Sequence, residues 1–394
     1  MKMETTSKSA IEDFSLARSG RLNKLLEWLG LDDPSVKGYA KRSIAIILVT
    51  WLPLLILSAF QGLAWGSRTN LNFIEDFATH AKYLLVVPIL IFSEHSVDNR
   101  LKILTAQFFK SGILTDNDLP AYQRLKVLTK NLSESGWADL VILTVVIINI
   151  VIRWHSYVQH QSTWLVYPDV NGNHISWAGA WYAFLSLPVF QYILARWLWR
   201  WIIWVIYFKK IANLPLRLSP AHPDKAGGLG FLGIPPAPFL HVVLAMAIIF
   251  ATTIAERIFW FHERLIQFYP VMIGFVVLSI VINVLPLVVF TKPMVSQYRK
   301  GIYEYSSLIK AHHHFFDQKW LENNDVLPLL GSQDASSTTD LNSTFDTVMS
   351  MQVVPFNLKT MLSTIVIAVL PMLPLLAFEY DWLELLKKIV GMLV

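Results

Sequence analysis

Residues 270–290 read Pro-Val-Met-Ile-Gly-Phe-Val-Val-Leu-Ser-Ile-Val-Ile-Asn-Val-Leu-Pro-Leu-Val-Val-Phe, with no charged side chain in the run. A bilayer core of about 30 Å needs roughly 20 apolar residues in one helix. Backbone amides in lipid must be hydrogen-bonded within the segment, and the run is too long for a barrel strand. The stretch therefore predicts a transmembrane helix and sets the class of the whole chain.

Six further segments match it in length and polarity, at 43–65, 74–92, 137–154, 177–198, 239–258 and 360–378. The second of these is the weakest, because it contains His80 and Lys82. Over the whole chain 54% of residues are hydrophobic and 15% are charged, against about 25% charged in an average soluble domain. We predict an all-α fold, an integral membrane helical bundle of about seven spans with cytoplasmic helices.

The basic residues gather in alternate connecting segments. Eight Lys and Arg lie in 1–42, six in 93–136 and six in 291–359, whereas 66–73 holds one. The positive-inside rule then places the N-terminus in the cytoplasm and the C-terminus outside, in what we expect to be the inner membrane of a bacterium. The N-terminal segment carries charges throughout and lacks the apolar core of a signal peptide.

The predicted organisation has four parts: a cytoplasmic segment 1–42 with an amphipathic helix, spans one to six over 43–290 with cytoplasmic loops 93–136 and 207–238, a cytoplasmic helical segment 291–359, and the last span with a short outer C-terminus over 360–394. The amphipathic helix at 11–29 either lies on the anionic inner leaflet or packs on the protein's own cytoplasmic part. A second amphipathic helix is predicted at 120–134. No internal repeat is found, which weakens an architecture of two inverted halves.

The sixth span is predicted to continue as a helix into the cytoplasm. Apolar and aromatic residues follow there at spacings of three and four, close to a heptad seam: Tyr298, Ile302, Tyr305, Ile309, His312, Phe316 and Trp320. The seam pairs between subunits or packs internally. A further helix, with Leu341, Phe345 and Val348 on one face, is predicted to end at Pro355.

A glycine-rich loop joins the fourth and fifth spans on the cytoplasmic side. Glycines let the backbone approach a ligand closely, and the following helix offers free amides. The loop is thus a candidate site for an anion, a phosphate or a lipid headgroup, or else a structural turn fixed by its prolines. Its candidate binding residues are Arg217, His222, Asp224, Lys225, Gly227, Gly228 and Gly230.

Two strings of sequence resemble those of a known family. They are His-Pro-Asp-x-x-Gly-Gly-Leu-Gly-Phe-Leu at 222–232 and Gly-x-x-Asp-x-x-Ser-x-x-Asp-Leu-x-x-x-Phe-x-x-Val-x-x-Met-x-x-x-Pro-Phe at 331–356. Together they are similar to a family of uncharacterised bacterial multi-pass membrane proteins, over the chain from about the fourth span to its end. The resemblance implies a bacterial source and a membrane location, and it implies no activity.

Charged residues inside spans need a physical reason, since each costs at least about 2.5–3.5 kcal/mol on insertion scales. Lys82 and Glu256 lie at comparable depth near the outer ends of spans two and five, so they are predicted to pair, as a structural lock or as part of an ion path. Arg196 and Arg200 lie one turn apart among tryptophans at the inner end of span four. They are predicted to snorkel to lipid or to line the inner mouth of a pore.

Several classes of function find no support. Three consecutive histidines, His312 to His314, precede Asp317, but only His313 and Asp317 share a helix face, so no metal site is predicted. No cofactor is expected, and no catalytic motif stands out. The chain has no cysteine, which excludes thiolate chemistry. Its formal charge of +5 is modest and does not point to nucleic acid.

Three hypotheses of function remain. The first is an oligomeric channel or transporter with a cytoplasmic gate or binding face, for which an anion is the candidate substrate. The second is a sensor or scaffold subunit that binds a cytoplasmic partner. The third is a lipid-handling enzyme with its site at the loop 217–233. The expected partners are the bilayer, including anionic lipid, and further copies of the chain.

Overall fold

The computed structural model describes residues 30, 33, 35–66, 68–160, 162–169, 172–234, 239–322 and 333–379 of the 394. The predicted N-terminal amphipathic helix and the outer C-terminus lie outside the described residues. The α-helices are α3 (Val36–Thr50), α4 (Leu52–Phe60), α5 (Phe77–His80), α6 (Val87–Lys110), α7 (Leu119–Ser133), α8 (Gly136–His160), α9 (Trp177–Trp181), α10 (Leu187–Ala212), α11 (Leu240–Phe261), α12 (Tyr269–Val288), α13 (Thr291–Trp320), α14 (Gln333–Met349) and α15 (Leu358–Val369).

Shorter elements complete the chain. The 3₁₀ turns are η1 (Phe73–Glu75), η3 (Asp116–Asp118), η5 (Gly230–Gly233), η6 (Leu265–Phe268) and η7 (Leu370–Phe378), and the π-helical segments are η2 (Ala81–Val86) and η4 (Tyr182–Ser186). Strands β1 (Val166–Asp169) and β2 (Gly172–Ile175) pair antiparallel.

Seven helical stretches among the described residues are long and apolar enough to cross a membrane. Each overlaps one of the seven predicted segments, so the prediction of a seven-span, all-α membrane bundle is confirmed. The spans run α3–α4, α5–α6, α8, α9–α10, α11, α12 and α15–η7. Two of them extend well past the predicted ends: the second continues to Lys110 and the fourth to Ala212.

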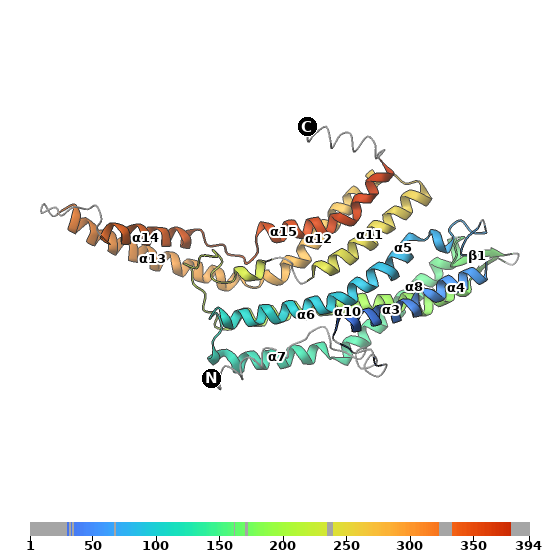
Figure 1. Cartoon of the computed structure of the whole chain (residues 1–394), viewed down its shortest axis with the longest axis horizontal. Coiled ribbons are helices and arrows are strands. Elements are labelled where there is room, and N and C mark those ends of the chain that lie inside the picture. The colour runs from blue at the N-terminus through green and yellow to red at the C-terminus, as the bar shows by residue number, and fades with distance from the viewer. Residues whose placement is uncertain are drawn as a thin grey trace.

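The bundle is elongated, and its connecting segments gather at its two ends (Figure 1). One end carries α7, the loop before α11, and the pair α13 and α14, while the other carries β1 and β2. We name these ends the inner and the outer side, after the predicted orientation. Helix α11 packs on α6 and α15, α12 packs on α15 and α10, and α10 packs on α7 and α8.

Proline explains where the spans depart from regular helix. A proline has no N–H and its ring collides with the carbonyl four residues earlier. In span one, Pro53 follows the break at Trp51, and the Trp181 indole N–H fills the gap by donating to the Val49 carbonyl at 3.1 Å. In spans two and four, a π-helical segment directly precedes Pro88 and Pro188. Such segments place an extra residue in one turn and often occur at functional sites.

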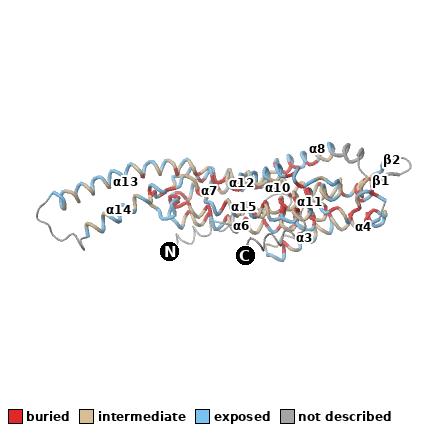
Figure 2. The backbone as a smooth tube through the Cα atoms, turned by 90° about the horizontal axis from the view of Figure 1, so that it is seen from above, coloured by how far each residue is buried: buried red, intermediate tan, exposed pale blue. Residues whose placement is uncertain are grey.

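Helices α13 and α14 form a hairpin that projects from the inner side (Figure 1). The backbone in Figure 2, coloured by burial, shows that the hairpin is mostly exposed, whereas buried residues concentrate in the bundle. The seam residues predicted in the continuation of span six are all half-buried, whereas most other residues of α13 beyond Gly301 are exposed, and α13 packs on α14. Within this chain, the seam therefore packs internally.

Candidate functional site

Four ionisable side chains lie together near the outer side. Asp76, His80 and Lys82 come from the start of span two, and Glu256 comes from span five. We call these four residues the outer cluster. Helix α11 packs against both α5 and η2, which brings the two spans into contact at this level.

Asp76 caps the N-terminus of span two. It is 8% exposed, and its carboxylate accepts hydrogen bonds from the Thr79 N–H at 2.7 Å and the Thr79 hydroxyl at 2.8 Å. The indole N–H of Trp164 donates a third bond at 2.9 Å. An aspartate at this position is favoured because it accepts from otherwise unpaired amides of the first turn. The hydrogen bond from Trp164 is not part of helix capping, and it connects Asp76 to the segment before β1.

Glu256 reaches the same helix start from span five. Its Oε1 accepts from the Ala78 N–H at 2.8 Å, one residue before the Thr79 N–H that Asp76 caps, and it interacts electrostatically with Asp76. Two carboxylates held this close repel each other when both are ionised, and a proton on one of them removes the repulsion. Asp76 and Glu256 are therefore a candidate site for binding a proton.

Lys82 lies beside this pair, but its hydrogen bond is to Tyr182 and not to the predicted partner Glu256. Its Nζ donates to the Tyr182 hydroxyl at 3.0 Å and lies 5.6 Å from the ring centre of Phe190, both residues of span four. It also interacts electrostatically with Glu256. The predicted pair of Lys82 and Glu256 is thus brought to one region, within a larger set that includes Asp76 and Tyr182.

The partners of His80 define its tautomer. Nδ1 faces the Trp51 indole N–H at 2.9 Å, and Nε2 faces the Ile74 carbonyl at 3.2 Å. An indole N–H only donates and a carbonyl only accepts, so Nε2 carries the hydrogen and Nδ1 is the acceptor. Adding a second proton to His80 would remove the hydrogen bond from Trp51.

The outer cluster is covered from outside by the segment around β1 and β2. Trp164 is fully buried, and its carbonyl accepts from the Ser176 hydroxyl at 2.7 Å, which ties the strand pair to the start of span four. The backbone of Trp164 also donates to the Leu71 carbonyl at 2.9 Å, so the cover connects spans one and two as well. Asp76 is therefore shielded from the outer solution by protein, whereas His80, Lys82 and Glu256 are half-buried.

At the inner ends of the spans, the structure places Arg196 and Arg200 in buried ion pairs. Arg200 Nη2 lies 2.7 Å from Glu94 Oε1, and Arg42 Nη1 lies 3.6 Å from Glu94 Oε2. Arg196 Nη1 lies 3.3 Å from Asp139 Oδ1, with both side chains 4% exposed.

This placement differs from a snorkelling belt or an open pore mouth, because a buried, paired guanidinium does not reach lipid or a passing anion in the single chain. Four spans contribute to these pairs, so their role in the chain is to join helices. Arg42, Glu94 and Asp139 were not predicted to take part; each lies near the inner end of a span, and that shared depth is the signal that could have found them.

The glycine-rich loop is occupied by its own aspartate. The Asp224 carboxylate accepts from the N–H groups of Ala226 at 2.8 Å, Gly228 at 3.1 Å and Gly230 at 2.8 Å. Partial burial opposes ionisation of Asp224, but these three amides and the His222 ring outweigh it and lower the pKa of Asp224. The amides predicted to hold an anion thus already hold an internal one.

The remaining predicted residues of this loop serve its packing. Gly227 and Gly228 have φ of +66° and +94°, and Lys225 also has a positive φ of 53°. A Cβ on Gly230 would lie 2.9 Å from Asp224 Oδ2. Arg217 begins the loop, and its backbone N–H donates to the Ile113 carbonyl at 3.0 Å. These contacts favour the structural alternative over a ligand site.

The two strings that carried the family resemblance pack against each other. A Cβ on Gly227 would meet the methyl of Met351 at 2.9 Å, and a Cβ on Gly233 would meet the Pro355 carbonyl at 2.8 Å. The Thr360 hydroxyl, at the start of α15, donates to the Gly233 carbonyl. The loop and the segment after α14 therefore form one joint at the base of the hairpin.

The consecutive histidines lie along the hairpin. His312 Nε2 lies 2.9 Å from the Thr338 hydroxyl, and His313 Nε2 lies 3.2 Å from Asn342 Oδ1. Among the described residues, no group of three or more His, Asp or Glu is placed to hold a metal ion. The histidines thus contribute to the contact of α13 with α14.

The sequence reasoning missed Asp76, Trp164 and Tyr182. Asp76 directly precedes an apolar run, which is the usual position of a helix cap and could have identified it. Nothing in the sequence connects Trp164 or Tyr182 to span two. Comparisons with protein-family models, with curated proteins and with solved structures each find no match, so the candidate site rests on its own geometry: a carboxyl pair between spans of a seven-span membrane protein.

Proposed function

We propose that this protein is a transporter or channel of the bacterial inner membrane, with its inner side in the cytoplasm, and that the outer cluster is its proton-binding site. The single observation that carries the proposal is the pair of carboxylates, Asp76 and Glu256, that come from two different spans and accept from adjacent N–H groups at the start of span two. Ionisable groups within a bundle are costly and characteristically mark proton or ion pathways.

The surroundings of the pair support a moving site over a fixed lock. A π-helical segment lies in span two directly after His80, and a second one in span four contains Tyr182, the partner of Lys82. Because a π turn has an extra residue, a small change in helix register is less costly there than in a regular helix. Release of a proton from the pair would place two like charges side by side and drive the two spans apart.

The charge of the cluster favours a proton over the anion considered from the sequence. Two carboxyl groups face one lysine, and the arginines and amides first considered for an anion are bound to Glu94, Asp139 and Asp224. We keep a homo-oligomer as part of the proposal; the exposed apolar side chains along α8 and α12 suit contact with lipid and with a further copy of the chain equally.

The test is proton flux into liposomes that contain the full-length protein. A pH-sensitive dye inside the vesicles reports flux after a pH step, with valinomycin and potassium clamping the voltage. We expect wild-type flux above empty vesicles and a loss of at least tenfold in Glu256→Gln. Asp76→Asn keeps the capping oxygen and is expected to fold, and it should lose flux to a similar extent.

The matched control is Glu263→Gln. This glutamate also lies near the outer side, where it pairs with Arg257 at 3.9 Å and remains 31% exposed. The Glu263→Gln substitution makes the same chemical change as Glu256→Gln outside the outer cluster, so proton flux should stay at the wild-type level. The proposal would be refuted if proton flux in vesicles with the wild-type protein did not exceed that in empty vesicles, or if Glu256→Gln and wild type gave equal flux.

A second candidate, a subunit that binds a cytoplasmic partner, is favoured by the surface of the hairpin. Outside the membrane-spanning part, α13 exposes Tyr303 at 74% and Phe315 at 68%, so both side chains are available to a partner protein. Cross-linking in cells from a photoreactive residue at position 315, with position 304 as the polar control, tests it. A specific adduct at 315 alone would support a partner, and equal labelling at both would not.

A further inference from the structure

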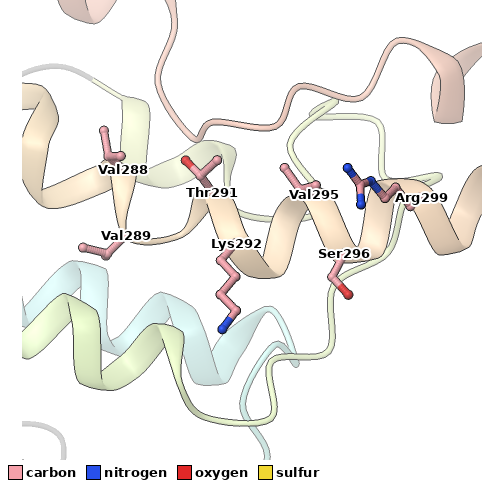
Figure 3. A pocket seen from close by; sticks show the side chains of 7 residues that line it. All are labelled: Val288, Val289, Thr291, Lys292, Val295, Ser296 and Arg299. Carbon is pink, nitrogen blue, oxygen red and sulfur yellow. The ribbon is translucent and has the colours of Figure 1, made fainter.

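We propose that a hollow at the junction of α12 and α13 binds the phosphate group of an anionic phospholipid. The hollow has a volume of about 640 Å³ and is lined by Val288, Val289, Thr291, Lys292, Val295, Ser296 and Arg299 (Figure 3). That volume falls within the usual range for ligand pockets, about 300–1,000 Å³. The site is distinct from the outer cluster and from the glycine-rich loop.

The position of the hollow matches the inner surface of the membrane. The apolar window of span six ends at Val288, and α13 begins at Thr291 with charged residues soon after. The hollow therefore extends from the last apolar turn of the span into the first polar turns beyond it. A phospholipid has the same order of chemistry, with its acyl chains on one side of the phosphate and water on the other.

The charges in the hollow are free for a ligand. Both Lys292 and Arg299 are exposed, and in the part of the chain that the structure describes neither of them forms an ion pair. No carboxylate lines the hollow. By contrast, Arg42, Arg196 and Arg200 at about the same level are held by carboxylates. Two unpaired cations without an acid between them attract a phosphate rather than a metal or a zwitterion.

A buried hydroxyl gives the hollow a further polar contact. Thr291 Oγ1 is shielded from solvent and has no hydrogen-bond partner within the described ranges. An unsatisfied buried hydroxyl has a cost, which a ligand oxygen would remove. The three valines supply an apolar part of the lining, which free phosphate does not need and a lipid does. The combination of a hydroxyl, two cations and an apolar wall is why we assign a lipid.

The experiment is native mass spectrometry of the full-length protein in detergent, incubated with equal amounts of phosphatidylglycerol and phosphatidylcholine. Wild type is expected to retain a phosphatidylglycerol molecule in preference to phosphatidylcholine. In Lys292→Gln/Arg299→Gln, the preference should fall by about tenfold or more, since each basic residue near an anionic lipid contributes a factor of roughly five. Both side chains are exposed, so the variant is expected to melt like wild type.

Two further variants separate a built site from general charge. Lys300→Gln/Lys310→Gln removes the same charge from the same helix outside the hollow and should leave the preference unchanged. Thr291→Val keeps the shape and the charge, and it should lower the preference severalfold. The proposal would be overturned if the preference fell equally in the two double variants. It would also be overturned if Thr291→Val had no effect while both double variants lowered the preference.

Inorganic phosphate distinguishes the two sources of the ligand group. Millimolar phosphate, compared with chloride at equal ionic strength, is expected to leave the bound phosphatidylglycerol in place, because phosphate makes no contact with the valines. Specific displacement by phosphate would assign the hollow to the free anion and refute the lipid. Proton flux in Lys292→Gln/Arg299→Gln is measured separately, and its result does not bear on this assignment.

Discussion

The carbonyl of Lys225 accepts a 2.7 Å hydrogen bond from the backbone N–H of Gln352. This bond joins the glycine-rich loop before α11 to the segment that leads from α14 into the last span. Lys225 can present its carbonyl in this direction because its φ is positive, a conformation that costs free energy outside glycine. The bond thus identifies the loop as a connection between the membrane bundle and the hairpin.

Gly301 tests this joint, because two effects of an alanine have opposite signs there. In a helix interior, Gly→Ala normally stabilises by roughly 0.5–1 kcal/mol. At Gly301, a Cβ would lie 2.5 Å from the Cβ of Pro220 on the loop, and a proline ring gives way poorly. We expect Gly301→Ala to destabilise by about 1–3 kcal/mol. Thermal unfolding in detergent measures it, with Gly274→Ala, whose Cβ would meet nothing within 4 Å, as the control.

Asp224 gives the loop a defined dependence on pH. Its pKa is lowered in the folded protein, so the ionised form stabilises the loop above the ordinary value of about 3.9, and this stability is lost as pH falls through the folded pKa. We expect the amides of Gly228 and Gly230 to lose protection from hydrogen exchange below about pH 4, after correction for intrinsic rates. Asp224→Asn should reduce protection at neutral pH and abolish the acid-dependent step. A step that persists in this variant would contradict the assignment.

Glu94 is predicted to be the most sensitive carboxylate at the inner ends of the spans. Glu94→Gln would leave Arg42 and Arg200 buried without their shared counter-charge, which typically costs 3–5 kcal/mol. The exposed Glu134, which pairs with Lys130 at 3.9 Å, is the control, and Glu134→Gln should change stability by less than about 1 kcal/mol. Unfolding midpoints of the two variants decide the question, and similar midpoints would show that the buried network contributes little.

The seam of the hairpin can be tested with introduced cysteines, since the chain has none of its own. His312 and Thr338 contact each other across α13 and α14. A short bismaleimide should link His312→Cys/Thr338→Cys within one chain, which migrates faster on a denaturing gel. Each single variant is the control, because it can cross-link only between chains. If the double variant gave mainly cross-linked dimers, the seam would be an interface between subunits and not a contact within one chain.

The spans could be read from sequence because a membrane helix is defined by its own composition, as in 270–290. The pairing of the charges could not be predicted from sequence. The partners of Glu94 are Arg42 and Arg200, which come from helices far apart in the chain. The loop was misleading for a different reason. Its glycines suggested free amides, yet the acceptor, Asp224, is two, four and six residues before the amides it binds. A short-range aspartate turn of this kind is visible in sequence.

The direct succession of α12 and α13 has a mechanical consequence. Only two residues, Val289 and Phe290, separate the last turn of span six from the 30-residue helix α13. At 1.5 Å per residue this helix is about 45 Å long, so a tilt of about 10° at its base would sweep its far end through about 8 Å. A displacement of span six too small to open the bundle would thus be magnified at the tip of the hairpin, as by a lever whose fulcrum lies at the membrane surface.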